Sequence, residues 1–427
     1  MKEELRKRVL EKITPKPEEV QFTEKIADEL IKKIKKEGYE AELVGSRARG
    51  TFISGDRDLD IFIFFDPKTP LEELEKKGLE IGKKVLKKYG PVTHYAQHPY
   101  VKAKVKGITV EIVPCYKIKT QIISAVDRTP LHNKYLKKKL KKEHIPEILL
   151  LKQFLKAAGL YGADQKTKGF SGYLCELLIL YYGSFDKLIE KAANEWNKRI
   201  IIDIENLRKD YSKFKEPLVV IDPVDKERNV ASAVSRKAIS LFIIKARQFL
   251  ERPSEEFFFP KEKKINLKEE IRGRNLILIS FKPPNVVGEI LWSQLEKLAK
   301  MIKEKLYEQE FHVYKFSYWT DEEKKCGMVF ELNTLSLNHY KRHRGPEVWD
   351  KENSKAFIEK NKKWWVMRSR LYAWKKRKHP EAKELIKEAL NSEQVPSHLK
   401  QPVKKAVILT NEKTLKEKEI LRRYFEV

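Results

Sequence analysis

Cysteine and glycine are scarce in this chain, and long apolar runs are absent. Its three cysteines, Cys115, Cys175 and Cys326, lie far apart among 427 residues, and no Cys-x-x-Cys pair occurs. This spacing indicates neither a zinc knuckle nor a disulfide framework, and it fits a reducing cytoplasm. No apolar run reaches the ~18 residues of a membrane span, and the N-terminus is too polar for a signal peptide. We therefore expect a cytoplasmic protein without a membrane-spanning segment.

Acidic residues are in the minority. The chain has 90 Lys and Arg residues against 62 Asp and Glu residues, which gives a formal net charge of +28. So large an excess suggests a polyanionic partner such as RNA. The hydrophobic content of 41% argues against wholesale disorder. The length predicts two to four domains.

Paired carboxylates on a predicted strand are the most informative local feature. Residues i and i+2 of a strand share a face, so Asp58 and Asp60 lie side by side, about 6.6 Å apart along the strand. Leu59 and Ile61 alternate onto the buried face. Two carboxylates this close repel each other, and a bound cation removes that cost. Magnesium prefers oxygen ligands, so the pair predicts a magnesium site.

A glycine-serine pair precedes these carboxylates. Gly45 allows the backbone to approach a phosphate closely. Ser46 is placed to cap a following helix, whose free N–H groups favour an anion. Taken alone, the pair also fits an ordinary turn with a helix cap, and Asp58 with Asp60 also fits a solvated edge strand. In this order, however, a phosphate cradle followed by a metal site predicts nucleotidyl transfer.

A third carboxylate lies on a later predicted strand. Glu111 stands within residues 108–114, which are rich in β-branched side chains. An acidic residue among apolar neighbours is costly unless it is paired or bound to a metal. Glu111 is therefore a candidate third metal ligand or the base for an attacking hydroxyl, and an exposed strand position is the alternative.

These features resemble a known family. The order Gly-Ser, Asp-x-Asp and a third carboxylate is similar to the DNA polymerase β-type nucleotidyltransferase superfamily. More narrowly, five stretches resemble the archaeal-type (class I) CCA-adding enzymes, the tRNA nucleotidyltransferases. They are His98-Pro99-Tyr100-Val101, Val113-Pro114-Cys115-Tyr116, Ser124-Ala125-Val126-Asp127-Arg128-Thr129-Pro130, Gly169-Phe170-Ser171-Gly172-Tyr173-Leu174-Cys175-Glu176-Leu177-Leu178, and Asp222-Pro223-Val224-Asp225 with Arg228-Asn229-Val230-Ala231. The resemblance is dense over roughly the first 260 residues and looser beyond them.

The resemblance implies roles for individual residues. Contacts to the triphosphate of the incoming nucleotide are implied for Ser46, Arg49, His132, Lys152 and Tyr161, with Gly45 in the same nucleotide-binding motif. The resemblance also implies that Arg228 reads the nucleotide base, and that Asp58, Asp60 and Glu111 hold two Mg²⁺ ions as the catalytic carboxylates. Many members of the family have glutamate where this chain has Asp58 and aspartate where it has Glu111. Both exchanges keep the charge and change its reach by one methylene.

The implied reaction is the template-independent addition of C, C and A to the 3′ end of tRNA, from CTP and ATP. The implied RNA partner is the acceptor stem and top half of tRNA, and family members are often dimeric, which suggests a homodimer. Two alternatives stay open. A poly(A) or terminal uridylyl polymerase shares the head and part of the neck, and a non-enzymatic RNA-binding protein is the second rival.

The expected architecture is a multidomain α+β protein. We predict a nucleotidyltransferase α/β head over residues 1–135, a helical neck over 136–260, and a C-terminal RNA-binding α/β body and tail over 261–427. The second boundary follows the cluster Phe257-Phe258-Phe259-Pro260, with Lys261-Glu262-Lys263-Lys264 as a linker.

The C-terminal part carries its own signals. A β-α-β-β order between residues 275 and 332 predicts a ferredoxin-like sheet with helices on one side. The basic and aromatic residues 339–345 predict either an RNA contact or an exposed loop. Trp364 and Trp365 are expected to anchor a small tail core, with RNA stacking as the second interpretation.

Overall fold

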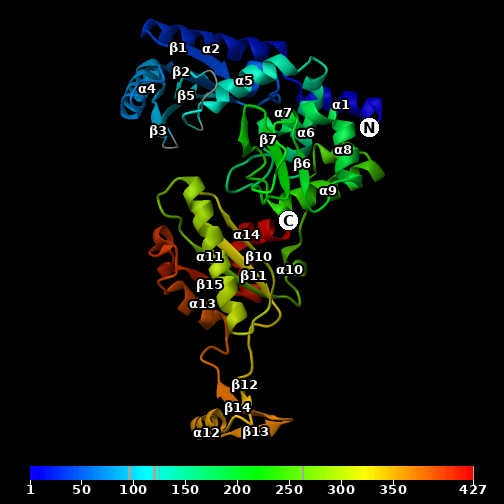
Figure 1. The fold of residues 1–427 in the computed structure, drawn as a ribbon, viewed down its shortest axis with the longest axis vertical. Helices are drawn as coiled ribbons and strands as arrows, with labels where there is room; N and C mark the ends of the chain where they lie inside the picture. The colour runs from blue at the N-terminus through cyan, green and yellow to red at the C-terminus, as the bar shows by residue number, and fades with distance from the viewer. Residues whose placement is uncertain (95–97, 119–121, 125, 262–263, 427) are drawn as a thin grey trace. The chain divides into compact units, whose positions relative to one another are not determined.

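The computed structural model describes residues 1–94, 98–118, 122–124, 126–261 and 264–426 (Figure 1). Ala125 of the motif at 124–130, and Glu262 and Lys263 of the expected linker, lie outside the described residues. The chain divides into two compact units, Met1–Lys261 and Glu262–Val427. In the described ranges, no helix is long and apolar enough to cross a membrane.

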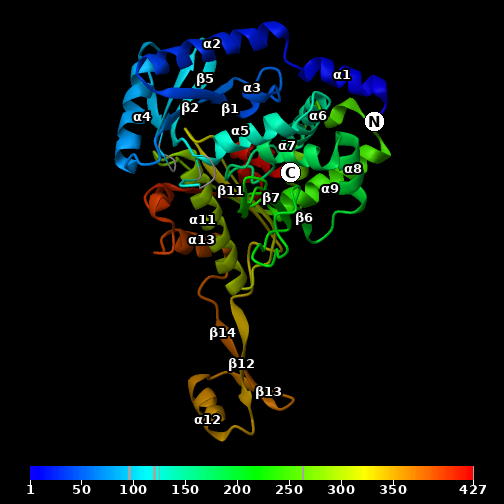
Figure 2. The same cartoon turned by 45° about the horizontal axis from the view of Figure 1, so that its top comes forward.

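The first unit begins with a five-stranded mixed sheet. Its strands in spatial order are β1 (Glu40–Val44), β2 (Asp58–Phe65), β5 (Ile108–Tyr116), β4 (Tyr100–Val105) and β3 (Val92–His94). Strands β2 and β5 run parallel, and the other neighbours are antiparallel. Helices α2 (Pro17–Lys36) and α4 (Leu71–Leu86) lie together on one side of this sheet (Figure 2). They bury Leu59 and Ile61, so the opposite face carries Asp58 and Asp60.

Local sequence explains where these elements begin and end. Helix α2 starts with Pro17 in its first turn, where a missing N–H costs nothing, and it stops before Gly38, whose φ is +86°. The strands predicted around Asp58 and Asp60 and over residues 108–114 are confirmed as β2 and β5. Gly45 opens the short helix α3 (Gly45–Arg49). The N-cap of α3 is Val44, so the prediction that Ser46 caps this helix is wrong.

The rest of the first unit is largely helical. Its helices are α1 (Glu3–Ile13), α5 (Arg128–Lys139), α6 (His144–Ala157), α7 (Gly172–Tyr182), α8 (Phe185–Asn194) and α9 (Arg236–Glu251). Phe154, Phe185, Phe242 and Phe249 form edge-on aromatic contacts at the centre of its core. A three-stranded sheet, not predicted from the sequence, accompanies the helices as β6 (Ile200–Ile202), β7 (Leu218–Asp222) and β8 (Asp225–Asn229). Every residue of β7 is buried.

The second unit contains a four-stranded sheet in the order β10 (Val313–Thr320), β11 (Cys326–Leu332), β9 (Asn275–Phe281) and β15 (Val407–Thr410). Helices α11 (Gly288–Glu308) and α13 (Ala382–Leu390) pack on one face. Helices α10 (Leu267–Glu270) and α14 (Lys418–Phe425) pack on the other. The expectation of helices on one side only is therefore wrong, because β9 is apolar on both faces and needs two covers.

A smaller sheet completes the second unit. It consists of β12 (Tyr340–Glu347), β14 (Arg370–Lys376) and β13 (Trp364–Met367), with α12 (Lys351–Lys360) beside it (Figure 1). Residues 339–345, for which an exposed loop was one expectation, mostly lie on β12. Trp364 is exposed and Trp365 half-buried, so neither anchors a tail core as predicted.

Candidate active site

Two of the predicted carboxylates are direct neighbours across parallel strands. The Cα register pairs Asp60 of β2 with Glu111 of β5. The same row continues to Lys102 of β4 on one side and to Val44 of β1 on the other. Lys102 Nζ donates to Glu111 Oε1 at 2.9 Å. The sheet thus sets two carboxylates and one lysine side by side on the face that helices α2 and α4 leave uncovered.

Asp58 lies on the same face of β2, two residues before Asp60, and is exposed at the start of the strand. Its register partner on β5 is Thr109 rather than an acid. Over the described parts of the chain, no three His, Cys, Asp or Glu side chains are gathered so as to hold a metal ion as they stand. The structure therefore pairs Asp60 with Glu111 directly, while Asp58 lies two residues earlier on β2, on the same face.

The environment of Asp60 disfavours its negative charge. Burial, together with the nearby carboxylates of Glu111 and Asp58, raises the pKa of Asp60 to about 7. Gly45 lies against the same carboxylate, since a Cβ atom at that position would be 2.8 Å from Asp60 Oδ2. Gly45 also has φ +77°, a conformation that glycine adopts without strain. The backbone turn at Gly45 is thus in contact with the neighbouring carboxylates of Asp60 and Glu111, which we call the acidic row.

A cavity of about 340 Å³ opens beside this turn. All seven residues predicted to bind nucleotide line it, namely Gly45, Ser46, Arg49, His132, Lys152, Tyr161 and Arg228. They come from α3, α5, α6, β8 and the segment after α6. The structure therefore brings together residues that are far apart in the chain, since Gly45 and Arg228 are separated by 183 positions.

Arg49 and Lys152 meet at one buried acid. Arg49 Nη2 donates to Glu176 Oε2 at 2.8 Å, and Lys152 Nζ lies 3.6 Å from Glu176 Oε1. Burial alone would raise the pKa of Glu176, but Lys152, Arg49 and the Thr51 hydroxyl outweigh it and lower that pKa. The cavity therefore carries an ionised carboxylate between two cations.

His132 and Arg228 meet at a second buried acid. His132 Nε2 lies 2.8 Å from Asp222 Oδ2, and Arg228 Nη1 donates to the same oxygen at 2.7 Å. Tyr173 stacks on the His132 ring at a centroid distance of 3.9 Å and donates to Asp222 Oδ1. Burial lowers the pKa of His132. The imidazole is thus held in place by stacking and by one carboxylate.

Several lining residues were not predicted from the sequence. They are Thr129, Ser171, Gly172, Tyr173 and Glu176, with Asp222 behind them. A signal for Glu176 existed, since it is one acid within an otherwise apolar helix. Asp222 gave a weaker signal, because it ends an apolar strand where an exposed turn is expected. Their partners are distant in sequence, so their roles follow only from the fold.

A mixed sheet that carries neighbouring carboxylates, next to a cavity lined by basic side chains, defines this protein as a nucleotidyltransferase. Family models agree along the chain, namely the nucleotidyltransferase domain at residues 23–132, the second domain of tRNA nucleotidyltransferase at 146–259, and the C-terminal domain of CCA-adding enzyme at 272–411. The chain belongs to the family of CCA-adding enzymes, the tRNA nucleotidyltransferases. Divalent metal dependence is general in the nucleotidyltransferase superfamily.

Curated relatives match over most of their length. The chain is 42% identical to the CCA-adding enzyme of Methanocaldococcus jannaschii over 410 residues, which cover 91% of each protein. It is 39% identical to that of Archaeoglobus fulgidus over 388 residues, which cover 87% of each. Among solved structures, a terminal uridylyl transferase, Cid1, aligns with a TM-score of 0.50 at 14% identity over 62% of this chain and 99% of Cid1. That last likeness concerns the fold alone.

Proposed function

We propose that this chain adds C, C and A in turn to the 3′ end of tRNA, using CTP and ATP and releasing pyrophosphate. The observation that carries the proposal is the contact between the acidic row and the cavity, where Gly45 touches Asp60 and lines the nucleotide pocket. The CCA-adding relatives support tRNA as the acceptor.

The cavity residues divide by the part of the nucleotide they bind. Ser46, Arg49, His132, Lys152 and Tyr161 hold the triphosphate through hydrogen bonds and positive charge. Alignment and electrostatics supply most of the rate in phosphoryl transfer, and these groups provide both. Arg228, at the cavity wall, reads the base. The 3′-hydroxyl of the RNA then attacks the α-phosphate in line, and pyrophosphate leaves.

We further propose that Asp58, Asp60 and Glu111 hold two Mg²⁺ ions. The fit rests on the neighbouring carboxylates of Glu111 and Asp58, which add to the effect of burial in raising the pKa of Asp60 and create a local excess of negative charge. Carboxylate oxygens are ligands that Mg²⁺ takes together with substrate phosphates. When bound, the ions supply stabilisation of negative charge on the attacking and leaving oxygens. Glu111, one carboxylate of this proposed site, also forms an ion pair with Lys102.

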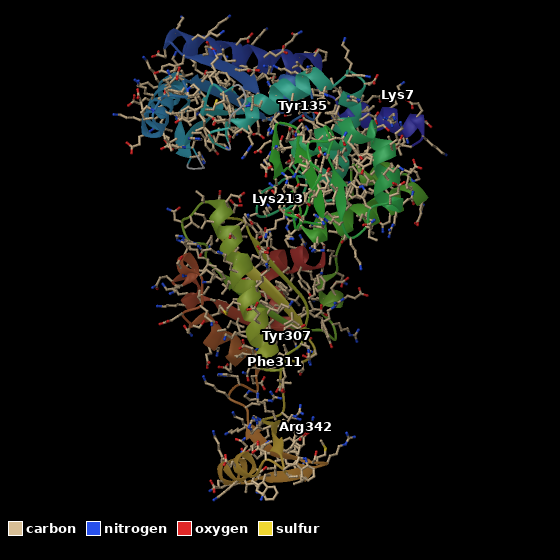
Figure 3. All side chains as sticks on the ribbon, in the orientation of Figure 1. Lys7, Tyr135, Lys213, Tyr307, Phe311 and Arg342 are labelled. Atoms are coloured by element: carbon tan, nitrogen blue, oxygen red, sulfur yellow. The ribbon has the colours of Figure 1, made fainter. Side chains whose placement is uncertain are left out.

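The small sheet of the second unit offers a surface for RNA. Trp365 lies 5.8 Å from Tyr372 and 5.1 Å from Trp374 between ring centroids, and the Arg342 guanidinium lies 5.2 Å above Tyr372. Arg342 is labelled on this sheet in Figure 3. These residues face away from α12, which packs against His343. Aromatic faces with arginines stack on bases and bind phosphates, which suits the acceptor stem and top half of tRNA.

Three tRNA transcripts test the proposal, ending just before the CCA, after its first C and after its second C. Each is incubated with CTP alone and with ATP alone. The proposal predicts that the first two accept C and the third accepts a single A. Steady growth on ATP alone, or on UTP, would favour a poly(A) or terminal uridylyl polymerase instead. No incorporation at all would favour a non-enzymatic RNA-binding protein.

The finer organisation stays a prediction. We propose a catalytic head over 1–135, a neck over 136–260 and an RNA-binding body and tail over 261–427. A homodimer is proposed from the family resemblance and a cytoplasmic location from the spacing of the cysteines. Light scattering at micromolar concentration tests the homodimer.

A further inference from the structure

A negative side chain lines a cavity that binds anions in the proposed reaction. Glu176 of α7 has no exposed surface. Its neighbours on the helix are apolar and buried, namely Leu174, Cys175, Leu177, Leu178 and Ile179. A buried carboxylate is costly unless it is paired. The partners of Glu176 therefore indicate its purpose.

Those partners are the cations of the cavity. The Arg49 guanidinium reaches both carboxylate oxygens of Glu176, with Nε at 3.3 Å from Oε1 and Nη2 at 2.8 Å from Oε2. The Thr51 hydroxyl donates to Oε1. Lys152 Nζ lies 3.6 Å from Oε1 and donates to the Thr51 carbonyl at 2.7 Å. One carboxylate thus connects α3 and the segment after it with α6.

Both cations need this carboxylate in order to be buried. The side chain of Arg49 is 7% exposed and that of Lys152 is 1% exposed. An uncompensated buried charge is strongly destabilising. The negative charge of Glu176 balances the positive charges of Arg49 and Lys152, which line the cavity.

The geometry of Arg49 also leaves donors for a ligand. Its bonds to Glu176 and to Asn133 Oδ1, at 2.9 Å, engage three of the five guanidinium N–H groups, as far as the described residues show. The plane of the guanidinium is therefore fixed, and N–H groups remain to meet phosphate oxygens.

We propose that Glu176 is a positioning residue for nucleotide binding, which fixes Arg49 and Lys152 toward the triphosphate. The inference rests on the proposed function, because it assigns the triphosphate to this cavity. Since the Glu176 side chain has no exposed surface, its role is to act through the two cations.

The test is the dependence of CTP incorporation on CTP concentration, with a tRNA transcript that ends before the CCA. Glu176→Gln keeps the shape of the side chain and removes its charge. We expect the KM for CTP to rise about 10- to 100-fold, since hydrogen bonds to charged groups are lost. The KM for tRNA should stay within about twofold of wild type, because the cavity does not bind the body of the RNA.

Glu147→Gln is the matched control. Glu147 of α6 also pairs with an arginine, Arg6, and accepts the Phe185 N–H at 2.8 Å. Its side chain is 12% exposed and it does not line the cavity. Both variants should lower Tm, but only Glu176→Gln should raise the KM for CTP.

A double variant tests whether Glu176 acts through Arg49. Arg49→Met alone should raise the KM for CTP, and adding Glu176→Gln should raise it by less than Glu176→Gln does in the wild type, because the two changes share one interaction. If Glu176→Gln does not fold, Glu176→Asp decides, since the shortened carboxylate cannot keep both pairs and should raise the KM to a smaller extent.

The outcomes separate this inference from the proposed function. A folded Glu176→Gln, or in its place Glu176→Asp, with the wild-type KM for CTP would overturn the positioning role. A lowered KM would overturn it too, because it would mean that the carboxylate mainly repels the triphosphate. Failure of the wild-type chain to incorporate any nucleotide would instead overturn the proposed function.

Discussion

Gly45 packs directly against the carboxylate of Asp60, so closely that a Cβ atom would lie 2.8 Å from Oδ2. Gly45 lines the cavity, and Asp60 belongs to the acidic row on β2 and β5. The contact therefore joins the nucleotide pocket to the carboxylates that are proposed to bind metal. A change at Gly45 should disturb both.

Gly45→Ala should lower incorporation about 100-fold, because displacement of a reacting group by about 1 Å has that effect. It should also destabilise the fold by about 1–2 kcal/mol, since φ is +77°. Gly38→Ala is the control, because Gly38 has φ +86° and nothing within 4 Å of the added Cβ. Equal loss of activity in both variants would show that backbone strain, and not the contact with Asp60, is responsible. The measurements are turnover with CTP and Tm.

Asp60→Asn should stabilise the protein in the presence of a chelator. Burial and the neighbouring carboxylates of Glu111 and Asp58 disfavour the charge of Asp60 and raise its pKa to about 7. Removing that charge should add about 1 kcal/mol, or about 2–4 °C in Tm. Mg²⁺ should raise the Tm of the wild type but not that of the variant. Asp28→Asn, on the exposed face of α2, controls for the change in net charge. A Tm of Asp60→Asn below that of the wild type, in the presence of chelator, would contradict the repulsion between Asp60 and the neighbouring carboxylates.

Asp222→Asn should cost stability in a pH-dependent way. Burial alone would raise the pKa of Asp222, but the bonds from His132 and Arg228 outweigh it and hold that pKa below its usual value. A lowered folded pKa means that the unfolded state binds more protons, so the contribution is full above the unfolded pKa of 3.8 and is lost as the pH falls below it.

Urea denaturation across this range checks the sign. The difference in unfolding free energy between wild type and Asp222→Asn should be up to about 3 kcal/mol near neutral pH. It should shrink below about pH 4, because Asp222 takes up a proton in the unfolded state there before it does so in the folded state. A difference that stays constant down to pH 3 would contradict the assignment of the effect to an ionised Asp222.

Trp374→Ala should weaken tRNA binding without changing the KM for CTP. Trp374 is 52% exposed and lies in the aromatic group with Trp365 and Tyr372 on the small sheet of the second unit. Loss of one stacking side chain should cost about 1–3 kcal/mol of affinity. Trp349→Ala is the matched control, since Trp349 is 73% exposed but follows β12 outside the aromatic group. Equal affinities of the two variants for tRNA would rule out the sheet as the contact.

Much of the head and the identity of the lining residues could be predicted from the sequence. The two-residue period of β2 placed Asp58 and Asp60 on one face, and motif context supplied residues such as Lys152 and Tyr161, which the structure brings to one cavity. The register that sets Glu111 beside Asp60 is a long-range pairing that no local pattern encodes. The same holds for Glu176, whose partner Arg49 is 127 residues away.

The small sheet within the helical neck could not be predicted from the sequence, for a related reason. Strand β7 is fully buried, and so short an apolar run has no period that distinguishes strand from helix. Its C-terminal residue, Asp222, stood in the sequence only as part of a family motif, and tertiary packing shows that it holds His132 and Arg228.

The most direct test of the account is incorporation of labelled CTP by wild type and Asp60→Asn, on a tRNA transcript that ends just before the CCA. The wild type should add two C residues and stop until ATP is supplied. The variant should lose incorporation by about three orders of magnitude, because charge stabilisation worth several kcal/mol is removed, while CTP binding to the Arg49 and Lys152 side of the cavity persists. Wild-type incorporation by Asp60→Asn would contradict the central claim that the acidic row and the cavity form one nucleotidyl-transfer site.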